Sequence, residues 1–373
     1  MPPRHVYVHV PFCARRCSYC DFAIAVRRHV PVNEYVTALG RELELRYADR
    51  GAWTADTLYF GGGTPSRLGG NGVARMMELL RRRIDLAPGA EVTLEANPED
   101  IDRESVSAWR EAGINRLSIG SQSFDDRVLE WMHRVHDARA IDRAVDAARG
   151  GGIDNVSLDL IFAVPERAER SWELDVAHAL SLEPTHLSLY GLTVEPQTPL
   201  GRWHARGEIA ESPEECYESE FLHAHDALGA AGFDHYEVSN FGLPGRHAHH
   251  NSAYWRGVSY AGLGPSAHEF DGGVRRWNTR AYAEWVRRLD HGEDPLDDAE
   301  QLTDENRTAE SVYLALRTTA GLVLSGAEIA RAEPWIAAGW ANLADGGRLV
   351  LTPHGWLRLD SLAADLTHVR SRY

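Results

Sequence analysis

The chain has 373 residues, a formal net charge of -16 and 43% hydrophobic residues, which suits a globular protein with one large α/β domain and a smaller one. The acidic charge argues against broad electrostatic binding to nucleic acid or to an anionic membrane surface. Lysine is absent, so chemistries that depend on it, such as P-loop and Schiff-base chemistry, are excluded. No apolar run is long enough to span a membrane and no targeting segment is recognised, so we expect a cytoplasmic protein.

Strand-like and helix-like segments alternate over the first two-thirds of the chain. This alternation predicts parallel strands joined by helical crossovers, and six such units favour an α/β fold built as a partial parallel (β/α)6 barrel. The predicted strands span residues 6–10, 57–60, 91–95, 116–119, 156–161 and 186–189. The predicted helices span residues 34–50, 73–83, 103–111, 138–149 and 170–180.

The alternation ends after about residue 233. Residues 233–268 are predicted as strands and loops, and the charged stretch 290–305 as a linker or exposed connection. From about residue 303, an apolar helical pattern, a Gly-rich turn, the short strand 349–351 and a further helix predict a smaller, mainly helical domain with a winged hairpin. The predicted domains are therefore 1–270 and 271–373. Winged hairpins often bind DNA, but the acidic charge disfavours a nucleic-acid partner.

Three cysteines, Cys13, Cys17 and Cys20, follow the first predicted strand with the spacing C-x3-C-x2-C. Three thiolates can hold three corners of a cubane iron–sulfur cluster and leave the fourth iron open to a substrate or cofactor. A disulfide needs an oxidising compartment, and structural zinc needs four ligands, commonly in two pairs. We therefore favour a cluster over both, and over a chance grouping of buried thiols. Cys216, in the helical stretch 213–231, is interpreted as a buried or incidental thiol.

Polar or Gly-rich segments follow the next predicted strands. They are Gly-Gly-Gly-Thr-Pro at 61–65, Glu-Ala-Asn-Pro at 95–98 and Gly-Ser-Gln-Ser at 120–123. In parallel barrels, functional groups collect at the C-terminal ends of the strands, so we expect these segments to share a rim with the cysteine loop. Asp159, inside the fifth strand, contacts either a ligand or an internal arginine. Arg134 either binds a ligand carboxylate or belongs to a surface ion pair.

Together these motifs resemble the radical S-adenosylmethionine (SAM) superfamily over about the first 270 residues, and in detail the oxygen-independent coproporphyrinogen oxidase family. The resemblance implies a radical-SAM barrel, a [4Fe-4S] cluster on the three cysteines, and SAM chelated on the open iron and cleaved reductively to a radical that the barrel shields. The matching segments are the cysteine loop and residues 62–65, 95–98, 120–124 and 159–162. The implied SAM-binding residues are Tyr7, Gly62, Gly63, Thr64, Glu95, Gln122, Arg134 and Asp159.

Two features separate the chain from the oxidase itself. Phe22 stands where the oxidase signature has a fourth cysteine, and we expect no N-terminal extension of the kind that closes the oxidase active site. The segment His-Asn-Ser-Ala-Tyr-Trp at 250–255 resembles the H-N-x-x-Y-W motif of the heme-chaperone branch of the family. Histidine is a common axial ligand of heme iron, and Tyr and Trp offer flat faces to a porphyrin. The resemblance implies heme as cargo, with His250, Tyr254 and Trp255 as candidate heme residues.

Three functions follow from these observations. The first is a chaperone that carries heme to acceptor proteins, which by resemblance are respiratory-chain hemoproteins reached by transient contact with membrane proteins. The second is a coproporphyrinogen III oxidase that decarboxylates propionates. The third, disfavoured by the acidic charge, is a radical RNA-modifying enzyme. From its chemistry alone, His250 fits better in a His-rich loop that binds nothing, and the resemblance of the motif reverses this preference. The sequence therefore favours the chaperone and leaves open whether the protein is an enzyme.

Overall fold

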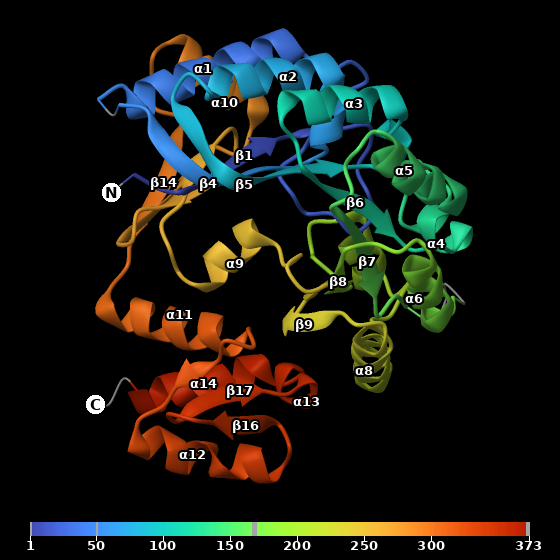
Figure 1. Ribbon diagram of the computed structural model, residues 1–373, viewed down its shortest axis with the longest axis vertical. Helices are drawn as coiled ribbons and strands as arrows, with labels where there is room; N and C mark the ends of the chain where they lie inside the picture. Colours follow the sequence, from blue (N-terminus) through green and yellow to red (C-terminus); the bar gives the residue numbers. More distant parts are fainter. Residues whose placement is uncertain (1, 50, 166–169, 371–373) are drawn as a thin grey trace.

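The structure, a computed structural model, describes residues 2–49, 51–165 and 170–370, and a nine-stranded sheet forms its centre (Figure 1). The strand order is β11-β1-β4-β5-β6-β7-β8-β10-β9, and the six strands β1, β4, β5, β6, β7 and β8 pair with one another in parallel. These six strands are β1 (His5–Val10), β4 (Trp53–Gly62), β5 (Ile84–Ala96), β6 (Arg116–Gln122), β7 (Val156–Phe162) and β8 (His186–Gly191). The predicted partial (β/α)6 barrel is confirmed.

Helices cover the outer face of this sheet (Figure 1). Their apolar residues pack on the strands in one core that contains the fully buried Trp109 and Trp172. Capping fixes their ends: Asp102 accepts a hydrogen bond from the Ser105 amide at the start of α3, and Gly113 ends that helix at φ +106°. The covering helices are α1 (Val32–Tyr47), α2 (Gly69–Leu80), α3 (Arg103–Ala112), α5 (Ala138–Gly150), α6 (Trp172–Ser181) and α8 (Glu214–Ala230). The last residue of the helix predicted over 34–50 lies outside the described residues.

Shorter elements extend the sheet or lie in its loops. β11 adds a parallel strand beside β1, whereas β10 and β9 add antiparallel strands beside β8. The expectation of only strands and loops over 233–268 is wrong at one place, because α9 forms there and carries the H-N-x-x-Y-W segment. These elements are β2 (Phe12–Cys13), β3 (Ala25–Val26), η1 (Pro65–Leu68), η2 (Pro98–Asp100), α4 (Asp126–Trp131), α7 (Pro199–Ala205), β9 (Asp234–Glu237), β10 (Asn240–Gly242), α9 (His249–Trp255) and β11 (Ala261–Leu263).

A small antiparallel sheet follows the barrel. It consists of β12 (His268–Phe270), β13 (Val274–Asn278) and β14 (Leu296–Gln301), with α10 (Tyr282–Asp290) packed against α1. The charged stretch 290–305 is therefore not a simple linker, since β14 pairs along β13 as an edge strand. Because β12 and β13 also pair across residue 270, this sheet straddles the predicted domain boundary, and the division at 270 remains a prediction.

The C-terminal part is mainly helical, as predicted. It lies below the barrel in Figure 1 and contains the expected winged hairpin, in which β16 pairs antiparallel with β17 around the turn at 345–347. Among the described residues, no helix is both long and apolar enough to cross a bilayer. The elements of this C-terminal part are α11 (Asp304–Leu316), β15 (Leu322–Val323), α12 (Gly326–Ala337), β16 (Ala341–Ala344), β17 (Arg348–Leu351), α13 (Pro353–Trp356) and α14 (Leu359–Arg370).

Candidate cofactor site

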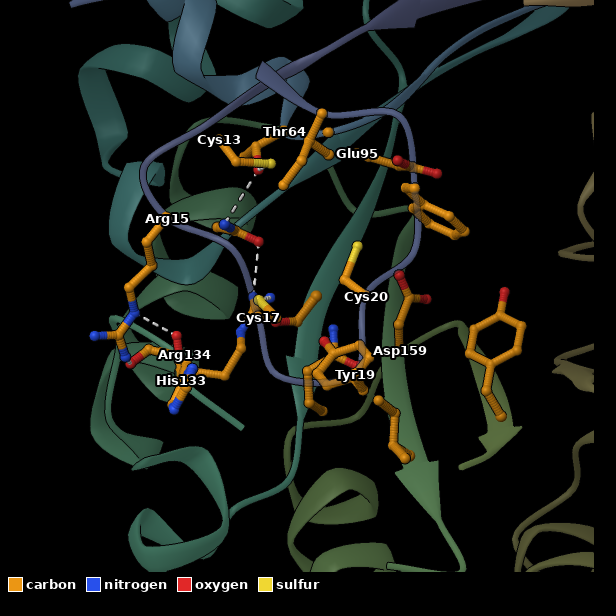
Figure 2. Close-up of a pocket in the computed structure, with 18 of the residues that line it drawn as sticks. Cys13, Arg15, Cys17, Tyr19, Cys20, Thr64, Glu95, His133, Arg134 and Asp159 are labelled. Atoms are coloured by element: carbon orange, nitrogen blue, oxygen red, sulfur yellow. Dashed lines mark hydrogen bonds between the residues drawn. The ribbon is translucent and has the colours of Figure 1, made fainter. Parts of the chain in front are cut away.

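The C-terminal ends of the central strands meet at a cavity of about 430 Å³, which we name the cofactor cavity (Figure 2). The expected common rim is confirmed, since segments from β4, β5, β6 and β7 line this cavity together with the cysteine loop. Of the predicted cluster and SAM residues, all except Tyr7 line it. They are Cys13, Cys17, Cys20, Gly62, Gly63, Thr64, Glu95, Gln122, Arg134 and Asp159.

The backbone around the cysteines is fixed by contacts that do not involve sulfur. The Ser18 amide donates to the Met132 carbonyl at 3.1 Å, and the Ser18 carbonyl accepts from the Leu200 amide at 2.8 Å. Arg15 donates to the backbone carbonyls of His133 and Arg134, the first of which Figure 2 draws. The loop is therefore anchored to the segment after α4 and to the start of α7.

The three thiols face the cofactor cavity in Figure 2. Burial raises the pKa of Cys13, and burial together with the other two thiolates raises the pKa of Cys20 to about 11. Cys17 Sγ accepts a hydrogen bond from the Arg134 guanidinium at 3.5 Å. Three half-buried thiols on one loop fit a multi-iron cluster, because bound iron supplies the positive charge that deprotonates its ligands.

Glycines allow the β4 loop to approach the cysteine loop. A Cβ on Gly63 would lie 2.6 Å from the carbonyl carbon of Pro11, a contact that no side chain makes without moving the backbone. Gly62 has φ +111°, and a Cβ there would lie 2.5 Å from the His9 ring. Thr64 follows, with its hydroxyl 3.5 Å from Cys13 Sγ. The glycine run thus closes one side of the site.

Two half-buried carboxyl groups face the same space. Glu95 accepts from the Tyr59 hydroxyl at 2.7 Å and from the Gly62 amide at 3.0 Å, and burial raises its pKa to about 7. Asp159 accepts from the Ser118 hydroxyl at 2.9 Å and from Ser157 at 3.3 Å, and burial raises its pKa to about 6. Serine hydroxyls, rather than an arginine, bind Asp159 directly, so its carboxylate can accept further donors from a ligand.

Arg134 lies inside the site rather than in a surface ion pair. Its guanidinium donates at 2.7 Å to the Asn97 side chain and to the Gly120 carbonyl, while its buried Nε has no partner among the described residues. Two non-glycine residues that line the cavity, Gln122 at φ +68° and His133 at φ +59°, have left-handed backbone conformations. Such strain is often found at functional sites.

Sequence reasoning missed several residues that support the site. Tyr59 holds Glu95, Ser118 holds Asp159, and Asn97 positions Arg134. Asn97 lies inside the motif at 95–98 but was given no role there, and Ser118 lies two residues before the motif at 120–123, whereas Tyr59 lies in an ordinary apolar strand and has no local signal. Cys216 lies outside the cofactor cavity, with Sγ 3.9 Å from a Glu220 oxygen, as expected of an incidental thiol.

The candidate heme residues and Tyr7 lie apart from the thiols. Tyr7 and Tyr254 line a second cavity of about 750 Å³, and Trp255 lines a third of about 630 Å³. His250 is buried, with Nδ1 2.7 Å from the Thr57 hydroxyl and Nε2 2.8 Å from the Tyr254 hydroxyl. The structure therefore does not bring the predicted heme residues together around one space.

Tyr59 separates the cofactor cavity from the second cavity. Its hydroxyl donates to Glu95. Its ring stacks on the His250 ring, with ring centres 5.0 Å apart, and on the Tyr7 ring, with ring centres 6.2 Å apart. The second cavity lies between the barrel, the hairpin β12–β13 and α11, and we name it the aromatic cavity. Its aromatic lining residues are Tyr7, His9, Tyr254, Tyr260, His268, Phe270 and Tyr313.

Comparisons with known proteins agree with this site. The Radical SAM superfamily description matches residues 7–176. The structure of coproporphyrinogen III oxidase (HemN) from Escherichia coli, a radical SAM enzyme, superposes with a TM-score of 0.82 over 98% of this chain and 90% of that one, at 22% identity, which establishes the fold alone. A protein named heme chaperone HemW from Mycobacterium tuberculosis is 39% identical over 370 residues, covering 98% of this chain and 95% of the relative.

The fold and the cysteine loop define a radical SAM protein. Further relatives named heme chaperone HemW, from Synechocystis sp. and Bacillus subtilis, are 37% and 34% identical and cover 86% of this chain, with 79% and 84% of their own lengths aligned. The chain belongs to the HemW family. Membership of the superfamily implies a [4Fe-4S] cluster and SAM, and when bound they supply one-electron reductive chemistry. The thiols, the glycine run and the carboxyl groups of the cofactor cavity fit both.

Proposed function

We propose that this protein is a heme chaperone: it binds heme as cargo, passes it to acceptor proteins, and holds a [4Fe-4S] cluster with SAM in its barrel. The observation that carries the proposal is the aromatic cavity beside the cofactor cavity, in a chain that aligns with HemW relatives over nearly its whole length. Aromatic walls suit a flat porphyrin, and the open iron of the cluster suits SAM.

The cofactor residues have separate tasks in this proposal. Cys13, Cys17 and Cys20 bind the cluster, and Arg134 donates a hydrogen bond to Cys17 Sγ. The backbone of the glycine run, with Thr64, would hold the nucleotide, while Gln122 shapes the end of β6. Glu95 and Asp159 provide carboxylate oxygens for the amino and hydroxyl groups of SAM. Tyr7 does not line the cofactor cavity but lies on the far side of Tyr59, so it acts on the SAM site through Tyr59.

The H-N-x-x-Y-W segment contributes to heme binding from α9. Tyr254 presents its ring to the aromatic cavity, and Trp255 packs under the guanidinium of Arg317 at 4.3 Å in the neighbouring cavity. His250 is held behind Tyr254 by one hydrogen bond at each ring nitrogen, to Thr57 and to Tyr254, and burial lowers its pKa to about 3. Direct ligation of iron by His250 would require one of these hydrogen bonds to break and the buried ring to become accessible.

Titration of the anaerobically reconstituted protein with hemin tests the proposal. A stoichiometric, saturable complex with a Soret band distinct from that of free hemin is expected. In a second experiment, the heme-loaded chain is mixed with the apo-form of a respiratory-chain hemoprotein, and we expect heme to move to that acceptor. Hemin that associates only without saturation would refute the chaperone.

The oxidase fold of the structural neighbour gives a contrasting activity to measure on the same sample. Coproporphyrinogen III is added anaerobically with SAM and a reductant, and vinyl products are followed. We expect no turnover, because Phe22 occupies the position of the oxidase's fourth cysteine and lines the cofactor cavity. Multiple turnovers without stoichiometric hemin binding would favour the oxidase instead.

A further inference from the structure

One face of the β12–β13 hairpin carries an unusual set of side chains. His268 pairs with Trp277, and Phe270 pairs with Arg275, in the antiparallel register. Residues two apart on a strand share a face, and so do directly opposed residues, so all four lie on the same side of the hairpin. His268, Phe270 and Arg275 line the aromatic cavity. A metal ligand, a flat apolar ring and a fixed cation therefore face one space.

His268 differs from the other histidine considered for iron. Its ring is exposed, and neither ring nitrogen has a hydrogen-bond partner among the described residues, whereas both nitrogens of the buried His250 are engaged. Trp277 stacks on His268 at 5.6 Å and 24°, which orients the ring without occupying its nitrogens. Desolvation and the nearby Arg275 lower the pKa of His268, so the ring is neutral and has a lone pair to offer at neutral pH.

Arg275 supplies the charge that a porphyrin carboxylate needs. Its guanidinium lies 5.7 Å from the centre of the Phe270 ring and pairs with Glu310 of α11 at 2.9 Å. A guanidinium binds a carboxylate in a bidentate geometry, so a propionate can replace or join Glu310 at this position. Tyr254 and Tyr313, from α9 and α11, provide further aromatic walls.

We propose that heme occupies the aromatic cavity with His268 as an axial ligand of its iron and Arg275 as the partner of a propionate. This proposal rests on the proposed function, since it assigns the place of the heme that the chaperone carries. A coordinate bond forms between a ring nitrogen of His268 and ferric iron, the water on that iron leaves, and no electron is transferred. His250 is then a positioning residue that holds Tyr254 at the cavity wall.

The assignment of the axial ligand is tested by hemin titration of full-length His268→Ala. His249→Ala is the matched control, and His250→Ala tests the other histidine considered as an iron ligand. His249 is exposed and lines none of the three cavities described. His268→Ala should weaken hemin binding by roughly tenfold or more and move the Soret band, and added imidazole should restore the wild-type band. His249→Ala should behave as wild type, and His250→Ala should keep the wild-type band position.

The possible outcomes separate the two proposals. If the wild type fails to bind hemin, the chaperone function itself falls. If the wild type binds and His268→Ala keeps both its affinity and its Soret band, heme binding stands but the assignment of His268 is overturned. A thermal unfolding scan of each variant shows whether a lost band reflects a lost ligand or a lost fold.

The role of Arg275 as the propionate partner is tested by two substitutions on strand β13. Arg275→Gln is compared with Arg276→Gln, which alters the opposite face, where Arg276 pairs with Asp294. Arg275→Gln should weaken binding of hemin by about tenfold and leave binding of hemin dimethyl ester unchanged, because the ester has no carboxylate to lose. Equal weakening for both porphyrins, or an equal effect of Arg276→Gln, would overturn the role of Arg275.

Discussion

Glu95 and Asp159 face the same cavity, and burial raises the pKa of both, to about 7 and about 6. A raised carboxyl pKa means that the folded protein holds a proton that the unfolded chain has already released. Stability is therefore highest below the unfolded pKa and falls as the pH rises toward the folded pKa. A bound ligand that brings a positive charge or hydrogen-bond donors reverses this cost, so these two groups link cofactor binding to pH.

Glu95→Gln should make the protein more stable at pH 8 and flatten the decline in stability between pH 4.5 and 7. The pKa shift of Glu95 corresponds to about 3 kcal/mol at most. Denaturant unfolding at several pH values measures this, with the exposed Glu104→Gln as control. The same variant should bind SAM more weakly by equilibrium dialysis. An unchanged pH profile would show that Glu95 titrates normally.

Cys17→Ser should remove the cluster, because three thiolates are needed to hold a cubane with one open iron. Iron analysis after anaerobic reconstitution should give about four irons per wild-type chain and a large loss in the variant. Cys216→Ser is the control, since its sulfur lies near Glu220 and outside the cofactor cavity. Equal iron content in both variants would contradict the assignment of the loop.

At the scale of elements, the sequence predicts the strands and helices that repeat the strand–loop–helix pattern. The six parallel strands were predictable because each is a buried apolar run followed by a polar loop and a helix. β14 was not, because it is an edge strand whose residues Asp297, Asp298 and Glu300 face solvent, as in a linker. α9 was missed because its start depends on Glu91, a distant residue that accepts from the amides of His249 and His250.

The same limit applies to the site. Spacing marks the residues that motifs contain, so the predicted cluster and SAM residues line the cofactor cavity, with Tyr7 as the exception. Ser118 and Tyr190, which also line the cavity, belong to no motif and were not predicted. The separation of Tyr254 and Trp255 into neighbouring cavities depends on how α9 turns against α11, which no local pattern encodes. His268 had no motif at all, since its position follows from the register of β12 with β13.

Gly63→Ala should destabilise the element that closes the cofactor cavity. Its Cβ would clash with the Pro11 carbonyl, which is backbone and has little freedom to shift. We expect a loss of about 1–3 kcal/mol in the free energy of unfolding and reduced iron incorporation. Gly229→Ala, where a Cβ meets nothing within 4 Å, is the control for a harmless added methyl group. A stable variant with full iron content would show that this loop can move.

At the scale of the whole molecule, Glu42 joins the barrel to the elements that follow it. This fully buried carboxylate of α1 accepts from Arg46 at 2.9 Å, from the Gly264 amide at 2.8 Å and from the Trp285 indole at 3.0 Å. Asn278 of β13 donates to it as well, at 2.5 Å. The aromatic cavity is bounded by both parts of the chain, so this network helps to hold its walls together.

Glu42→Ala should lower the free energy of unfolding by about 3–5 kcal/mol, because it leaves several buried donors without an acceptor. Chemical denaturation measures the loss, and limited proteolysis near residues 264–290 should become faster. Glu44→Ala, which removes the partner of Arg83 on the surface, should change stability by less than about 1 kcal/mol. Similar effects of the two substitutions would remove the special role of Glu42.

The anchoring of the cysteine loop has one more consequence. Arg15, Ser18 and their backbone partners hold the cysteine loop without help from sulfur. Loss of iron through oxidation should therefore leave the backbone of this loop in place. An emptied molecule would then need only iron, sulfide and electrons to be repaired, and not a new round of folding. Repeated cycles of oxidation and refilling should therefore recover the same protein.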